Sequence, residues 1–202
     1  MLSQRPVSGK PSAFFLEDLV GGKAMDTRSC ILELRGQLEG LPSGVRYARE
    51  YENLIGEMLA LCFPGSLRHI EPQIREIDNC VRRDWIAANV APGGFWGMVR
   101  VLYKATQIVW ECKNTVRLRV GDFHQAAYYI SKVLGRFVIL SFRGEVTTQH
   151  LKHTKRIVSE QDGLVLLLTD KDLCWLMEEA VNGRPPEIYL QDVFNSTLRA
   201  IS

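Results

Sequence analysis

The apolar residues of this chain recur with helical spacing in six segments. The clearest helix covers residues 46–62, where apolar side chains return every three or four positions and Pro64 follows the segment. These side chains are Tyr51, Leu54, Ile55, Met58, Leu59 and Cys62. The same spacing, with turn or capping residues at the ends, predicts helices over residues 25–39, 121–135, 147–160, 170–182 and 190–201.

Five other segments have the pattern of strands. Residues 136–142 (RFVILSF) and 164–169 (LVLLLT) are continuously apolar, which is typical of strands buried on both faces. Residues 69–79 and 80–90 are two short extended segments around the turn signal Asp78-Asn79, and residues 107–114 form a third. We expect these three to pair as a meander. The order of the elements predicts an α/β fold with a central mixed β-sheet flanked by helices.

The connection before the third strand begins APGGFW, which predicts a loop. Phe95 and Trp96, directly after Gly93-Gly94, admit two interpretations. They are either part of a mobile loop beside a substrate or core residues reached through a turn.

Length and composition indicate one globular domain with additions. The chain has 202 residues, of which 46% are hydrophobic and 24% charged, and its net charge of +2 argues only weakly against a nucleic-acid partner. We divide it into a flexible N-terminal arm at 1–23, a preceding helix and loop at 24–45, and the main domain at 46–202.

The cysteines and the apolar runs bear on location. The five cysteines are odd in number and widely spaced, which favours reduced thiols in a cytoplasmic protein over a disulfide framework or a zinc site. The chain has no long apolar span, so we expect no membrane partner.

The candidate chemistry lies in the segment IVWECKNT at 108–115. In a strand, Ile108, Trp110 and Cys112 share one face, whereas Val109, Glu111 and Lys113 share the other. Asp84 opens the preceding extended segment, DWIAANV. Two carboxylates on neighbouring strands suit a hard divalent cation such as Mg²⁺, and a nearby lysine can hold or deprotonate a water that attacks a phosphate. The pattern outlines a hydrolytic phosphodiester site.

These residues resemble the PD-(D/E)xK nuclease superfamily, whose fold is called restriction-endonuclease-like. RRDWIAANV followed by IVWECKN is similar to the strand pair that carries the active site in that superfamily. The resemblance covers about residues 47–169 and extends to the order of the elements. It implies a restriction-endonuclease-like α/β sandwich and a metal-dependent nuclease.

The resemblance also implies roles for individual residues. Asp84 and Glu111 would bind Mg²⁺, which Mn²⁺ can replace, through their carboxylates, and Cys112 would bind it through its backbone carbonyl. Lys113 would orient the attacking water, and Glu52 would support the metal or its water shell. Gln125 matches a polar residue on the helix behind the site.

Several assignments have alternatives. Asp78 is a rival to Asp84 as the first metal-binding acid, and the separation of 27 positions between Asp84 and Glu111 is long for a tight hairpin. Glu52 is equally explained as a solvated residue at the edge of an apolar stripe. Gln125, three positions after Asp122, is equally explained as a capping-box partner.

Further polar residues are weaker candidates for contact with substrate. Arg82, Arg83 and Asn114 are placed to contact phosphates, although a solvated strand edge and turn chemistry also explain them. His150 and His153 have a spacing compatible with a metal, but an exposed basic helix face with Lys152, Lys155 and Arg156 is the better interpretation.

We therefore expect a Mg²⁺-dependent endonuclease that acts on nucleic acid, with DNA favoured over RNA. By analogy of fold alone, it would work in restriction or anti-phage defence, as a homodimer or with a partner sensor protein. The alternative is a catalytically inactive module of the same fold that binds nucleic acid or protein, in which Glu111 and Lys113 form a structural ion pair.

Overall fold

A computed structural model describes residues 26–72 and 83–202. The predicted N-terminal arm, Asp78 and Arg82 lie outside these ranges. Within them, five strands form one sheet in the order β1-β2-β3-β4-β5. The strands are β1 (Leu67–Pro72), β2 (Trp85–Asn89), β3 (Gln107–Lys113), β4 (Phe137–Phe142) and β5 (Leu164–Thr169).

The sheet is mixed, as the sequence predicts. Strand β2 runs antiparallel to both β1 and β3, which confirms the meander, and β4 and β5 continue the sheet in parallel with β3. The parallel pairing places Lys113, the last residue of β3, beside Phe142, the last residue of β4. The carboxyl ends of β3 and β4 therefore lie side by side, at the same end of the sheet.

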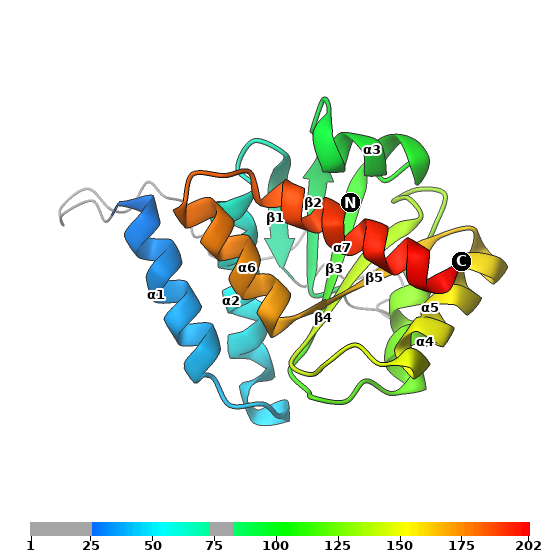
Figure 1. The fold of residues 1–202 in the computed structure, drawn as a ribbon, viewed down its shortest axis with the longest axis horizontal. Helices are drawn as coiled ribbons and strands as arrows, with labels where there is room; N and C mark the ends of the chain where they lie inside the picture. The colour runs from blue at the N-terminus through cyan, green and yellow to red at the C-terminus, as the bar shows by residue number, and fades with distance from the viewer. Residues whose placement is uncertain (1–25, 73–82) are drawn as a thin grey trace, which may run out of the picture.

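Helices cover both faces of the sheet (Figure 1). Helices α1 (Thr27–Gly40), α2 (Ala48–Cys62) and α6 (Asp170–Val181) pack together on one side, with α3 (Gly94–Leu102) and α7 (Pro186–Ile201) continuing that layer. Helices α4 (Val120–Tyr128) and α5 (Thr148–Gln161) pack on the other side. A short 3₁₀ turn, Val45–Tyr47, leads into α2.

The two faces of β3 separate as the alternation predicts. Ile108, Trp110 and Cys112 belong to the larger core cluster under α1, α2, α3, α6 and α7. Val109 belongs to the smaller cluster under α4 and α5. Glu111 and Lys113 therefore lie on the α4 side of the sheet.

The predicted loop after β2 is wrong beyond residue 93, because helix α3 begins at Gly94. Of the two interpretations of Phe95 and Trp96, the core is correct: both are buried. The ring centroid of Phe95 lies 5.0 Å from that of Trp96 and 5.9 Å from that of Phe194 on α7. This aromatic packing outweighs the loop signal of the preceding glycines.

The helix predicted over 121–135 is also too long. Helix α4 ends at Tyr128, and a bridge between Ser131 and Gly135 follows. Gly135 has a φ of 121°, and a Cβ there would lie 2.3 Å from the Cα of Ala105. The chain leaves the helix early because this close approach ties it to the segment before β3.

The structure describes four of the five cysteines and every helix in its two ranges. Cys30, Cys62, Cys112 and Cys174 are all free thiols. No helix in residues 26–72 or 83–202 is long and apolar enough to cross a membrane.

Candidate active site

A pocket of about 580 Å³ opens at the carboxyl end of β3. Its walls come from the start of α2, the residue before β2, the end of β3, the loop that follows and helix α4. Seven of the residues predicted for the site line it: Glu52, Asp84, Glu111, Cys112, Lys113, Asn114 and Gln125.

Glu111 and Lys113 form a close ion pair at the floor. Lys113 Nζ lies 2.6 Å from Glu111 Oε1. The Glu111 side chain is fully buried, and its second oxygen, Oε2, has no hydrogen-bond partner within the described part of the chain. A buried carboxylate oxygen without a donor is costly, and this one is available to a cation.

Asp84 reaches the same place from the neighbouring strand. It lies just before β2, which pairs with β3 only from Trp85 onward, and its Oδ2 accepts a hydrogen bond of 2.9 Å from the backbone N–H of Cys112. The side chain therefore takes the place that a backbone acceptor would occupy if β2 were longer. Within a strand, N–H and C=O of one residue point to the same edge, so the Cys112 carbonyl is directed to the edge where Asp84 lies.

The two acids share an environment that disfavours charge. Burial, and then the nearby charge of Glu111, raise the pKa of Asp84 to about 7, against the lowering effect of the Cys112 hydrogen bond. Burial also raises the pKa of Glu111, although Lys113 opposes this. Two neighbouring carboxyls whose pKa values are raised by burial and by each other are often found at functional sites.

Lys113 is held as a charged donor. Burial alone would lower the pKa of Lys113, but the charge of Glu111 and their hydrogen bond raise it overall. A protonated lysine donates hydrogen bonds and supplies positive charge. Its predicted role toward an attacking water stays a prediction.

Helix α4 fixes the direction of the lysine. Gln125 Oε1 accepts a hydrogen bond of 2.9 Å from Lys113 Nζ, and Gln125 Nε2 donates one of 3.0 Å to the hydroxyl of Tyr129. The interpretation of Gln125 as a capping residue is wrong, because Asp122 itself accepts from the backbone N–H of Arg119 at 2.7 Å and caps α4.

Tyr129 is a residue that the sequence analysis missed. Its ring is buried, and its hydroxyl, close to Glu111, lowers the pKa of that carboxyl in opposition to burial. Tyr129 caps the C-terminal end of α4 and follows Gln125 by four positions, so both side chains lie on the same side of the helix. The four-residue spacing of Gln125 and Tyr129 is present in the sequence, but no prediction was drawn from it.

Glu52 is brought to the pocket by contacts around Trp85. The Trp85 indole donates a hydrogen bond of 2.7 Å to the backbone carbonyl of Glu52. One turn later on α2, a Cβ at Gly56 would lie 2.0 Å from the Trp85 ring, so only glycine permits this approach. The charge of Glu52 contributes to the raised pKa of Asp84 and of Glu111, after the larger effect of burial.

The residues present fit a hard divalent cation with limited protein ligation. No set of three or more Asp, Glu, His or Cys side chains in residues 26–72 and 83–202 is placed to hold a metal ion by itself. Asp84, Glu111 and the Cys112 carbonyl would supply oxygen ligands only, and Mg²⁺ bound by one or two carboxylates usually keeps several waters. The unpartnered Glu111 Oε2 supports the fit.

Asn114 and Arg143 connect the site to the rest of the domain. The Asn114 side chain donates to the carbonyls of Pro42 and Gly44 and accepts from Arg143 Nη1 at 3.0 Å. Arg143, which follows β4, also pairs with Asp170 at the start of α6. The structure thus gives Asn114 a structural role, and its predicted contact with substrate stays a prediction.

The remaining predicted contacts are distributed differently. The Arg83 guanidinium lies over the ring of Tyr129, 5.5 Å from its centroid, so it packs behind the site. Its contact with phosphate stays a prediction. Arg82 is outside the described residues.

The prediction of an exposed face at His150 is wrong. His150 is buried and caps α5, where its Nδ1 accepts from the Thr147 N–H at 3.3 Å. The ring centroid of His153 lies 4.9 Å from that of Phe123. Neither histidine lines the pocket.

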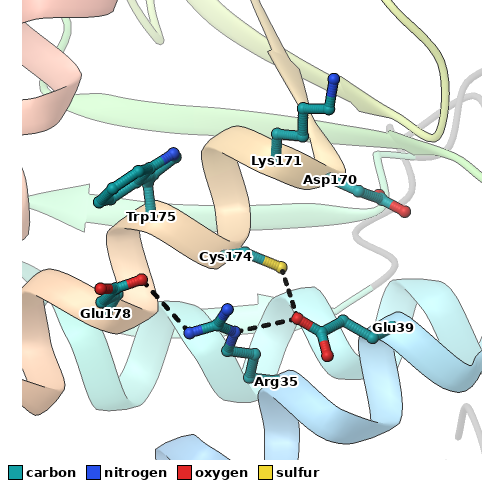
Figure 2. Close-up of a pocket in the computed structure, with 7 residues that line it drawn as sticks. All are labelled: Arg35, Glu39, Asp170, Lys171, Cys174, Trp175 and Glu178. Atoms are coloured by element: carbon teal, nitrogen blue, oxygen red, sulfur yellow. Dashed lines mark hydrogen bonds and ion pairs between the residues drawn. The ribbon is translucent and has the colours of Figure 1, made fainter.

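A second pocket, of about 380 Å³, lies between α1 and α6. Figure 2 shows Arg35 on α1 between two carboxylates, with Nε 3.0 Å from Glu39 and Nη1 3.3 Å from Glu178. Burial raises the pKa of Cys174 in this pocket to about 11, so the thiol is not activated. Arg35 pairs with Glu39 and Glu178 inside this pocket, whereas Asp170 and Lys171 pair with Arg143 and Glu145 outside it. Its described residues thus offer no group comparable to the acid pair.

Comparison with known proteins gives one partial similarity. The chain is 27% identical over 155 residues to the "Putative transposon gamma-delta 80.3 kDa protein" of Escherichia coli (strain K12). The match covers 74% of this chain and spans only 22% of that protein's length. No protein-family model matches the chain, and no solved structure matches it. The fold and site therefore define the class only as an α/β protein with a mixed five-stranded sheet and an acidic pocket at the carboxyl end of β3.

Proposed function

We propose that this protein is a metal-dependent nuclease of the PD-(D/E)xK type that hydrolyses phosphodiester bonds in DNA. The observation that carries the proposal is the grouping of Glu111, Lys113 and Asp84 in one open pocket, with Lys113 Nζ 2.6 Å from Glu111 Oε1. The mixed sheet with its meander supports the restriction-endonuclease-like fold. The partial similarity to a putative transposon protein favours DNA, since a transposon is a DNA element.

Each residue has a chemical task in this proposal. Asp84, Glu111 and the Cys112 carbonyl hold the cation, which when bound lowers the pKa of a coordinated water and stabilises charge on the phosphate. Lys113 donates a hydrogen bond to the attacking water and offsets the negative charge that builds on the phosphate oxygens. Attack forms one P–O bond and breaks another, and the leaving oxygen takes up a proton. Gln125 and Tyr129 keep Lys113 in place.

The inactive module stays the alternative from another class. An ion pair kept only for structure would not need an orphan oxygen on Glu111 or a second carboxyl beside it, and both features cost stability. The positions of Asp84 and Gln125 thus favour the enzyme. Cytoplasmic location, a homodimer or a partner sensor protein, and a part in restriction or anti-phage defence stay predictions.

Cleavage of supercoiled plasmid with and without Mg²⁺ or Mn²⁺ tests the proposal. We expect metal-dependent cleavage by the wild type, and a loss of at least about 100-fold in Lys113→Ala and Glu111→Gln with the melting temperature retained. Arg100→Ala on α3, whose side chain is exposed and does not line the pocket, is the matched control. Cleavage that persists in both site variants would show that the site is assigned wrongly.

A further inference from the structure

Two arginines stand on the wall of the pocket that follows β3. Arg117 and Arg119 lie in the loop between β3 and α4, and both line the pocket with exposed side chains. Leu118 between them packs against the core under α4 and α5. Leu118 thus anchors the loop on its partly buried side, while the arginines on either side of it are exposed to solvent.

A third arginine stands beside the opposite wall. Val45 in the 3₁₀ turn, with Ala48 and Glu52 on α2, lines the pocket there. Arg49 is exposed and directly follows Ala48 in the first turn of α2, but it does not itself line the pocket. An exposed arginine next to a lining residue adds positive charge beside the pocket.

The two walls are fixed to each other through Asn114. Gly44 N–H donates to the Asn114 carbonyl at 2.8 Å, and the Asn114 side chain donates back to the Gly44 carbonyl at 2.8 Å. The loop after β3 is also tied to the end of β4, since Arg143 N–H donates to the Thr115 carbonyl at 3.0 Å. The arginines therefore start from backbones held in one arrangement, which reduces the entropy lost on binding.

The side chains of the three arginines have no acidic partner among the residues that the structure describes. Among residues 26–72 and 83–202, no carboxylate forms an ion pair with Arg49, Arg117 or Arg119, whereas Arg143 and Arg184 are paired. The pocket thus has an acidic floor, which a cation would neutralise, and a basic rim. A small phosphate ester would fill the floor and leave the rim unused.

We propose that Arg117 and Arg119 on one wall, together with Arg49 beside the other, form a phosphate clamp that holds a nucleic-acid strand across the pocket. The inference rests on the proposed function and makes it specific, because it assigns the substrate to polynucleotides and names the residues that select them. The rim contacts phosphates on either side of the reacting one. Guanidinium groups suit this task since they bind phosphate oxygens in pairs and fix the strand without reading its sequence.

Binding measured apart from cleavage tests the clamp. The assay is fluorescence anisotropy of a short labelled DNA duplex over a range of salt concentrations, in the Lys113→Ala background with Mg²⁺ present. We expect Arg117→Gln with Arg119→Gln to weaken binding about tenfold and to reduce the slope of log affinity against log salt by about two. Arg49→Gln, beside the other wall, should reduce the slope by about one.

The matched control removes the same charge elsewhere. Arg28 on α1 and Arg100 on α3 are exposed and do not line the pocket, so the double change Arg28→Gln with Arg100→Gln should leave affinity and slope unchanged. An equal loss of binding in this control would overturn the clamp, because net charge alone would then explain it. Melting temperatures within a few degrees of the wild type confirm that each variant is folded.

The outcomes separate this inference from the proposed function. If the protein binds DNA through these arginines but shows no metal-dependent cleavage, the clamp is supported and the proposed nuclease activity is rejected. If the variant Arg117→Gln with Arg119→Gln cleaves DNA and binds it with wild-type affinity, the clamp is rejected and the proposed nuclease activity is retained. Competition by poly-L-glutamate as strong as that by DNA would overturn the assignment to nucleic acid in favour of an acidic protein.

Discussion

Lys113 and Gln125 come from different elements and meet at 2.9 Å, where the amide oxygen of the glutamine accepts from the ammonium group of the lysine. Lys113 also donates a hydrogen bond to the carboxylate of Glu111. The two hydrogen bonds, to Glu111 and to Gln125, together fix the position of the ammonium group. Tyr129 in turn occupies the amide nitrogen of Gln125, so the amide is not free to rotate. Helix α4 is therefore part of the site even though it offers no acid.

Loss of this support should reduce the rate more than it reduces metal binding. We expect Gln125→Ala to lower kcat for DNA cleavage about tenfold or more, because Lys113 then keeps only its bond to Glu111. Tyr129→Phe should have a smaller effect in the same direction. Mg²⁺ affinity by calorimetry should stay within about threefold of the wild type. A fall in metal affinity that matches the fall in rate would instead place Gln125 in the metal shell.

The raised pKa of Asp84 predicts how stability depends on pH without metal. The carboxyl has an ordinary pKa near 3.9 when unfolded and about 7 when folded, so the folded state binds more protons between these values. The contribution of the Asp84 carboxyl to the free energy of unfolding is therefore greatest below about pH 4, and it decreases as the pH rises toward 7. We expect Asp84→Asn to be more stable than the wild type at pH 8 by roughly 1–4 kcal/mol.

Chemical denaturation in EDTA at pH 5 and pH 8 measures this difference. The advantage of Asp84→Asn should shrink toward pH 5, where the wild-type carboxyl is protonated. Added Mg²⁺ should raise the melting temperature of the wild type at pH 8 but not that of Asp84→Asn. A wild type that gains stability from pH 5 to pH 8 relative to the variant would contradict the assigned direction.

The contact of Trp85 with Gly56 predicts a cost in both stability and activity. Gly56→Ala inserts a methyl group into the space of the indole, so we expect a loss of roughly 1–3 kcal/mol in the free energy of unfolding. The ring cannot yield without weakening its bond to the Glu52 carbonyl, so metal-dependent cleavage should fall as well.

Gly36 provides the control for that experiment. It lies in α1, is exposed, and has no atom within 4 Å of the Cβ that alanine would add. Gly36→Ala should therefore be neutral or stabilising by up to about 1 kcal/mol. Equal effects of the two changes on unfolding would refute the steric explanation.

Replacing Arg143, the buried arginine that follows β4, should destabilise the protein far more than replacing an exposed arginine. Arg143 pairs with Asp170 and donates to the Leu38 carbonyl and to Asn114, so Arg143→Met leaves several buried acceptors unpaired. We expect a loss of roughly 3–5 kcal/mol by urea denaturation. Arg156→Met, which removes an exposed pair with Glu160 on α5, should cost no more than about 0.5 kcal/mol.

The sequence predicted the sheet well because its strands carry strong local signals. The continuous apolar runs of β4 and β5 are typical of strands that are buried on both faces. In β3, the alternation of the residues predicts which side chains lie on which face of the sheet. The pairing of Asp84 with Glu111 followed from the same patterns, once Asp84 was placed at the start of β2. Helix α3 was missed because Pro92, Gly93 and Gly94 signal a turn, whereas the packing of Phe95 and Trp96 that makes the helix is tertiary.

The residues of α4 that position Lys113 were harder to predict from the sequence than the two acids. The predicted capping box paired Asp122 with Gln125, but α4 begins earlier, with Arg119 at its N-cap and Asp122 as the residue that accepts from the Arg119 N–H. Tyr129 was not among the residues predicted for the site. Its role follows from where α4 lies against β3, which no local pattern contains.

The helical excursion between β2 and β3 has a consequence for how the two acids are connected. Asn89, at the end of β2, donates to the carbonyls of Trp96 and Ala105, so both ends of the excursion are fastened at the edge of the sheet away from the pocket. The excursion also carries Val99, which is buried in the larger core cluster, and Tyr103, whose carbonyl accepts from the Arg136 N–H at 2.8 Å. The segment that separates the two acids along the chain is therefore a packed part of the domain, attached at the end of the strands opposite the pocket.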